Sequence, residues 1–128
     1  LARYVSALEP ATHQRVWDGL LAVRCWQSAQ GSDTALRDRA RAQMDRALTR
    51  GIVRVLQDRA QRVGMTTGAE RDAHLAFVRV IGTFLDRAAR AIDPAAADTL
   101  RAAFMGSDPA AFPAASVVST LERLFPCP

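Results

Sequence analysis

The residue types that most often carry catalysis or bind metals are few in this chain and widely spaced. Among its 128 residues are two histidines, His13 and His74, and two cysteines, Cys25 and Cys127. Neither histidine lies in an HExxH or ExxH pattern, and the cysteines lack the paired spacing of a zinc site. The sequence therefore predicts no metal and no cofactor, and it leaves open whether Cys25 and Cys127 form a disulfide.

Patterns for nucleophilic catalysis, acid–base catalysis and phosphate binding are missing from the sequence. No serine occurs in GxSxG, and no glycine-rich phosphate loop is present. The acidic residues are spread along predicted outer faces of helices, without a convergent pair that would suggest acid–base work. Nothing here argues for an enzyme, and we predict no catalytic residue.

His74 is the most notable titratable residue, because it falls on the apolar side of a predicted helix. Antiparallel folding about residues 65–66 brings His74 level with Gln57 and Asp58. We expect a boundary histidine with one ring nitrogen bonded, and Asp58 is one candidate partner.

The segments that position these residues are predicted to be helices. Apolar residues recur at three- and four-residue steps, and no segment alternates with period two. Long helices are expected over 10–29, between Ser32 and Gly64, and over 68–92, with shorter ones over 94–105 and 114–125. The predicted fold is all-α: an antiparallel bundle of three long helices plus a fourth layer of two short C-terminal helices, in a single domain of residues 1–128.

Several helix starts carry recognisable signals. Ser32, Asp33 and Thr34 offer N-cap oxygens before the longest helix, and Thr67 with Glu70 fits a capping box. The pairs Asp93-Pro94 and Asp108-Pro109 place a capping aspartate directly before a proline at the first helical position.

The apolar stripes also predict a core. Leu48, Ile52, Ile81 and Leu85 are expected at its centre, and Trp17 on the apolar stripe of the helix over 10–29. In the helix over 68–92, Phe77, Val80 and Phe84 widen the stripe, which suggests contact with more than one neighbouring helix.

Two glycines, Gly51 and Gly82, lie inside predicted helices, where a missing side chain permits either a close approach of two helices or a pocket. Antiparallel folding sets Gly51 nearly level with Gly82, and each costs about 1 kcal/mol relative to Ala in a helix interior. We expect the two backbones to approach closely there. The alternative is a pocket for a small apolar ligand, which a cavity of several hundred cubic ångströms would support. Its candidate lining is Gly51, Gly82, Met44, Ile52, Val78, Ile81 and Phe84.

All seventeen basic residues are arginines, but thirteen acids leave a net charge of only +4. Arg46, Arg50 and Arg54 form a same-sign row along the longest helix, which we interpret as a solvated face in preference to an anion site. Together with Trp26 and Phe112, this row is the candidate interaction surface. Trp26 lies off the apolar stripe, so either a neighbouring segment or a partner is expected to cover it.

The leading hypothesis is a non-enzymatic helical-bundle module that mediates protein–protein interaction as an adaptor, regulatory or targeting domain. Its partner would be another protein or a second copy of the chain, and the composition suggests a bacterial source. One alternative is binding of the Arg-rich face to an anionic surface, a phospholipid membrane or a nucleic acid. The other is a ligand-sensing bundle with a pocket near Gly51 and Gly82. No apolar run approaches the length of a transmembrane helix, and the compartment stays open, with the cytoplasm slightly favoured.

Overall fold

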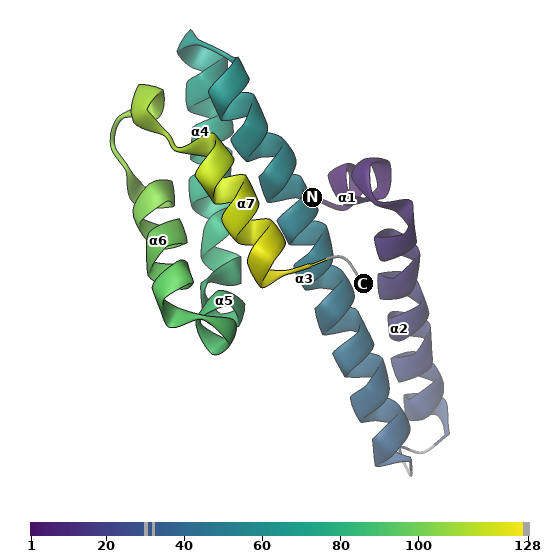
Figure 1. Cartoon of the computed structure of the whole chain (residues 1–128). Coiled ribbons are helices and arrows are strands. Elements are labelled where there is room, and N and C mark those ends of the chain that lie inside the picture. The colour runs from purple at the N-terminus through teal and green to yellow at the C-terminus, as the bar shows by residue number, and fades with distance from the viewer. Residues whose placement is uncertain (30, 32, 127–128) are drawn as a thin grey trace. The chain divides into compact units, whose positions relative to one another are not determined.

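The computed structural model describes residues 1–29, 31 and 33–126, and every regular element in these ranges is a helix (Figure 1). The all-α class is therefore confirmed. The chain divides into two compact units, the first made of Leu1–Arg54 and the second beginning at Val55. Each unit is described by itself below. That residues 1–128 act as a single domain stays a prediction.

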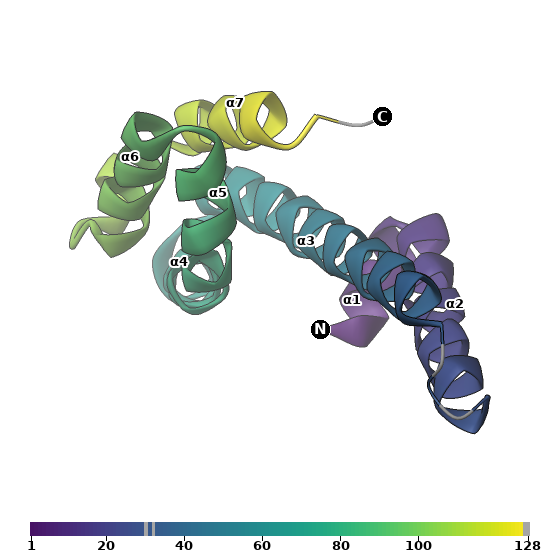
Figure 2. The same cartoon turned by 90° about the horizontal axis from the view of Figure 1, so that it is seen from below.

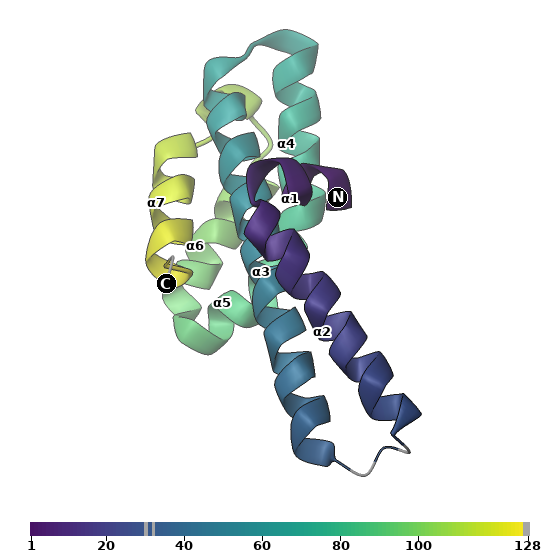
Figure 3. The same cartoon turned by 90° about the vertical axis from the view of Figure 1, so that its right-hand side faces the viewer.

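The first unit is a helical hairpin with a short helix at its start. It contains α1 (Ala2–Leu8), α2 (Pro10–Ser28) and the part of α3 (Thr34–Met65) that ends at Arg54. Pro10 occupies the first turn of α2, where its missing N–H costs no hydrogen bond. Figure 3 shows α2 and this part of α3 lying side by side in opposite directions.

The second unit packs the remainder of α3 with the helices that follow it. These are α4 (Gly68–Gly82), the 3₁₀ turn η1 (Thr83–Leu85), α5 (Asp86–Ile92), α6 (Pro94–Met105), the 3₁₀ turn η2 (Pro109–Ala111) and α7 (Ala114–Leu124). Helix α6 packs against both α5 and α7, and Figure 2 shows these three helices grouped together. The core contains large side chains that are fully buried, among them Leu56, Leu75, Val78 and Leu121.

The long helix predicted over 68–92 is interrupted. It ends at Gly82, passes through η1 and resumes as α5 at Asp86. A 3₁₀ turn has 3.0 residues per turn rather than 3.6, so three such residues rotate the following face by about 60°. Leu85 is buried as predicted, whereas Phe84 within η1 is 67% exposed and Val80, in α4 before η1, is 64% exposed, against the prediction for both.

Most predicted helix starts are correct. The Asp93 carboxylate accepts a hydrogen bond from the backbone N–H of Ala96 at 3.0 Å, and Asp108 accepts one from Ala110 at 2.8 Å. At the start of α3 the cap is Asp33, which accepts from Leu36 at 2.9 Å. Ser32 lies outside the described residues. The capping box at Thr67 is not formed, because the Thr67 side chain makes no cap hydrogen bond.

The predicted centre of the core is only partly correct. Leu85 is buried and Ile52 and Ile81 are half-buried, but Leu48 is 49% exposed. The seam of α3 in the first unit is made of small residues, Ala40, Ala47 and Gly51, all of them buried. Leu48 follows Ala47 by one residue and therefore points about 100° away from that seam.

Candidate binding surfaces

Helix α2 carries two apolar faces, whose centres point about 130° apart around the helix axis. Its inner face, toward α3, is made of residues that recur at three- and four-residue steps: Thr12, Val16, Gly19, Val23 and Trp26. Thr12 and Gly19 are buried, and Gly19 packs against the Met44 side chain so closely that a Cβ there would overlap it. The inner face thus holds the hairpin together through small residues.

The second apolar face of α2 is exposed. Trp17 is 55% exposed, Leu20 48% and Leu21 45%. Their spacing of three and four residues puts them on one side of the helix, and we call these three residues the outer face of α2. The prediction that Trp17 lies on the buried stripe is wrong, because the seam with α3 runs along the other side. His13 and Arg24, both exposed, extend the outer face by one turn at each end.

The aromatic residues nominated from the sequence as contact surface are largely covered. Trp26 is half-buried, with the Arg37 guanidinium 5.5 Å from its ring centroid. Gly31, which has a positive φ of 67°, approaches the same ring so closely that a Cβ there would lie 3.1 Å from it. Phe112 is also half-buried. Neighbouring segments therefore cover Trp26, and the sequence signal for the exposed surface was the spacing of Trp17, Leu20 and Leu21.

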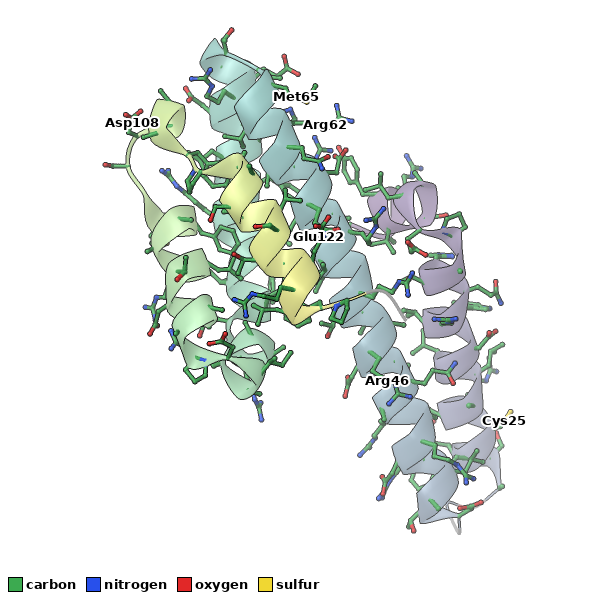
Figure 4. All side chains as sticks on the ribbon, in the orientation of Figure 1. Cys25, Arg46, Arg62, Met65, Asp108 and Glu122 are labelled. Carbon is green, nitrogen blue, oxygen red and sulfur yellow. The ribbon has the colours of Figure 1, made fainter. Side chains whose placement is uncertain are left out.

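The arginine row on α3 is less available to a ligand than its sequence suggests. Arg50 Nη2 donates to Glu9 Oε1 at 3.2 Å, and Arg54 Nε lies 3.6 Å from Glu9 Oε2. The Glu9 carboxylate, at the start of α2, thus contacts two of the three arginines. Arg46 is exposed and projects from α3 (Figure 4).

His74 is buried and has one ring nitrogen bonded. Arg59 Nη1 lies 3.1 Å from His74 Nδ1, and Nε2 lies 3.6 Å from a Glu70 carboxylate oxygen. Arginine can only donate, so Nδ1 accepts and the proton of the neutral ring is assigned to Nε2. The predicted partner Asp58 instead accepts from Arg62 at 3.0 Å.

The two glycines predicted to face each other are each covered by a side chain of their own unit. A Cβ at Gly51 would lie 2.9 Å from Val5, and one at Gly82 would lie 2.5 Å from the Phe104 ring. Each glycine is therefore closely packed within its own unit. Of the other nominated pocket residues, Met44, Ile52 and Ile81 are half-buried, Val78 is in the core and Phe84 is exposed.

The second unit nevertheless has a cavity beside Gly82. It has a volume of about 330 Å³, is partly open to solvent, and lies between the segment from Gly82 to Ala89 and helix α6. Apolar side chains form most of its wall, namely Leu85, Ala89, Ala97, Leu100, Phe104 and Met105. Thr83, Asp86 and Arg101 supply polar atoms. Gly82 is the one residue of the nominated lining that borders this cavity.

Ionic contacts tie the two walls of the cavity together. Arg90 Nε donates to Asp86 Oδ2 at 2.9 Å, and Arg90 Nη2 lies 2.7 Å from Asp98 on α6. These two carboxylates raise the pKa of Arg90. At the other end, Arg79 donates to the backbone carbonyls of Phe104 and Gly106, which satisfies the C-terminus of α6.

Within the described residues no group of three or more His, Cys, Asp or Glu side chains is placed to hold a metal ion. Cys25 is an exposed thiol on α2 (Figure 4). Cys127 lies outside the described residues, so whether the two cysteines form a disulfide stays open. No described helix combines the length and apolar character needed to cross a bilayer. Comparison with protein-family models, curated proteins and solved structures finds no match to this chain.

Proposed function

We propose that this chain is a non-enzymatic helical module that binds another protein through the outer face of α2. The observation that carries the proposal is the exposure of Trp17, Leu20 and Leu21 on one side of that helix. Tryptophan is among the residues that contribute most to interface energies, and contiguous exposed apolar patches mark interaction sites more often than chance.

The mode of binding follows from the spacing of these residues. Trp17, Leu20, Leu21 and Arg24 stand at i, i+3, i+4 and i+7, the pattern by which an amphipathic helix docks into an apolar groove. Within the described residues Arg24 forms no ion pair. The partner surface that fits is therefore an apolar groove with a carboxylate near the end that receives Arg24.

The hairpin suits such a presenting role. Its inner face supplies the contacts with α3, so the outer face is not needed to hold α2 in place. Replacing Trp17 and Leu21 by Ala should leave the unfolding free energy within about 0.5 kcal/mol for each, as at other exposed sites. The same double variant should abolish partner binding, because it removes two of the three apolar anchors.

A photo-crosslinking amino acid at Leu20 tests the proposal directly in cells that make the protein. We expect one discrete adduct with a second protein, lost in the Trp17→Ala, Leu21→Ala background. The matched control places the crosslinker at Asp45, an exposed residue of α3 outside this face. An adduct of twice the chain's own mass would indicate a homo-oligomer instead. Equal adducts from both positions would mean that the outer face has no specific partner.

Binding to an anionic membrane or nucleic acid is the weaker candidate. The contacts of Arg50 and Arg54 with Glu9 reduce the charge that the row offers to phosphates. Retention on heparin across a salt series, compared between the native chain and Arg46→Gln, tests it. A steep salt dependence that flattens in the variant would favour anion binding.

A further inference from the structure

The cavity beside Gly82 lies in the second unit and takes no part in the function proposed above. Small residues form part of its wall: Ala89 of α5 and Ala97 of α6 both line it. The Phe104 ring occupies the position that a side chain at Gly82 would take. What remains is a hollow of about 330 Å³, near the lower end of the range of small-molecule pockets.

The wall of this hollow is held by contacts within the second unit. Leu85, Ala89, Ala97, Leu100 and Phe104 are all buried, so they belong to the core as well as to the cavity. The Arg90 contacts to Asp86 and Asp98 hold α5 and α6 together at one end, and Arg79 holds the end of α6 at the other. A preformed apolar cavity of this kind binds apolar molecules without the cost of ordering its wall.

The charges that line the cavity distinguish between kinds of apolar molecule. Asp86 Oδ2 accepts from Arg90 Nε at 2.9 Å, whereas Asp86 Oδ1 is buried and has no hydrogen-bond partner among the described residues. Arg101, on the opposite wall, is exposed and makes no ion pair with any described residue. Arg101 is therefore the charged group of the wall that lacks a counter-ion, and an anionic head group would pair with it. Guanidinium groups bind carboxylates with short, charge-assisted hydrogen bonds.

We propose that this cavity is a binding site for an aliphatic monocarboxylate of medium chain length. The hydrocarbon chain lies against Leu85, Leu100 and Phe104, and the carboxylate pairs with Arg101. Exposed Met105 at the edge of the cavity adapts to chains of different length, since its thioether side chain is flexible.

The test compares three probes of equal chain length, octanoate, octanol and octylamine, each titrated into the full chain by calorimetry below its micelle concentration. We expect octanoate to bind at least tenfold more tightly than octanol, because a hydrogen bond to a charged group is worth about one such factor or more. Octylamine should bind most weakly. Arg101→Gln should remove the advantage of octanoate over octanol. The matched control Arg87→Gln, an exposed arginine of α5 outside the cavity, should keep it.

A second variant locates the site. Ala97→Phe fills the hollow and should abolish binding of all three probes, whereas Ala102→Phe on the exposed side of α6 should not. Circular dichroism checks that both variants fold. If Ala97→Phe does not fold, methyl NMR of Leu100 and Met105 in the native chain replaces it, with shifts expected at both residues on adding octanoate. Equal affinity for the three probes, or octanoate binding that survives Arg101→Gln or leaves these methyl signals unmoved, would overturn the proposal.

Discussion

In the first unit the buried positions are occupied mostly by small residues, Thr12 and Gly19 of α2 together with Ala40 and Ala47 of α3. In the second unit they include large ones, such as Leu56, Leu75, Leu121 and Phe104. Both units also expose large apolar residues, in the first unit on the outer face of α2 and at Leu48. The two units thus differ in the size of the side chains that fill their cores.

This difference indicates which apolar residues stabilise the fold and which are available to bind a partner. Burial of a large apolar side chain stabilises a fold by about 1.5–3 kcal/mol, so the second unit has most of the hydrophobic stabilisation. The first unit relies on close approach of two helices along a narrow seam. A unit of 54 residues is small for an independent core, which makes large side chains left outside that core unexpected unless another surface covers them. The contrast is the physical reason for assigning the partner to α2.

Substituting a leucine in each unit should produce the largest difference. Leu121→Ala should lower the unfolding free energy by about 2–5 kcal/mol, because Leu121 is fully buried and the change leaves a cavity. Leu48→Ala should cost no more than about 0.5 kcal/mol. Urea denaturation followed by circular dichroism measures both. A comparable loss in the two variants would mean that the units do not differ in this way.

Filling a glycine position tests the packing of the second unit. Gly82→Leu places a side chain where the Phe104 ring lies and should destabilise the protein by about 1–3 kcal/mol through overpacking. Ala102→Leu, an exposed helical site on α6, is the control and should have little effect. A raised melting temperature for Gly82→Leu would show that the adjoining cavity can accept the displaced ring.

A substitution at the buried contact between α2 and α3 should raise the stability of the protein instead of lowering it. Thr12 is 1% exposed, and its hydroxyl has no hydrogen-bond partner among the described residues. Thr12→Val keeps the shape and removes the unsatisfied hydroxyl, so we expect a gain of about 1 kcal/mol in unfolding free energy. Thermal unfolding checks this, with Thr34→Val at an exposed site as control. A loss of stability would indicate that the Thr12 hydroxyl is bonded in solution.

How far the sequence anticipated this structure depends on whether a feature is local. The caps at Asp93 and Asp108 were predictable because an aspartate before a proline acts on its own next turn. The failed capping box at Thr67 shows that even a local pattern can be left unused. The exposure of Leu48 was not predictable, since helical period defines a stripe but not which part of it a neighbour covers.

The binding surfaces were anticipated less well than the helices. Periodicity placed Trp17 on an apolar stripe, but α2 has two such stripes, and only the position of α3 decides which is buried. The cavity lies beside Gly82, one of the two nominated glycines, and Ala89 of α5 and Ala97 of α6 line it. The turn η1 interrupts the helix beside this cavity, and no residue pattern in the sequence predicted that interruption.

The smallest expected effect concerns two carboxyl groups, one from each unit. The pKa of Asp93 is lowered, mainly by the hydrogen bond from the Ala96 backbone and then by Arg123. The pKa of Asp38 is lowered by its hydrogen bond with the neighbouring Arg37. A carboxyl group with a lowered pKa in the folded state stabilises it above the unfolded pKa of about 3.9, and this contribution is lost as the pH falls below that value.

The two groups should nevertheless respond differently to substitution. Asp93 caps α6 and contacts α7 through Arg123, whereas Asp38 pairs with its own neighbour, a contact that the unfolded chain can also make. Asp93→Asn should therefore lower the melting temperature at pH 7, and its difference from the native chain should shrink as the pH falls below the unfolded pKa of about 3.9. Asp38→Asn should follow the native curve throughout. Melting temperatures of the three proteins measured from pH 7 to pH 3 decide this, and a constant offset for Asp93→Asn would mean that its charge contributes nothing beyond the capping hydrogen bond.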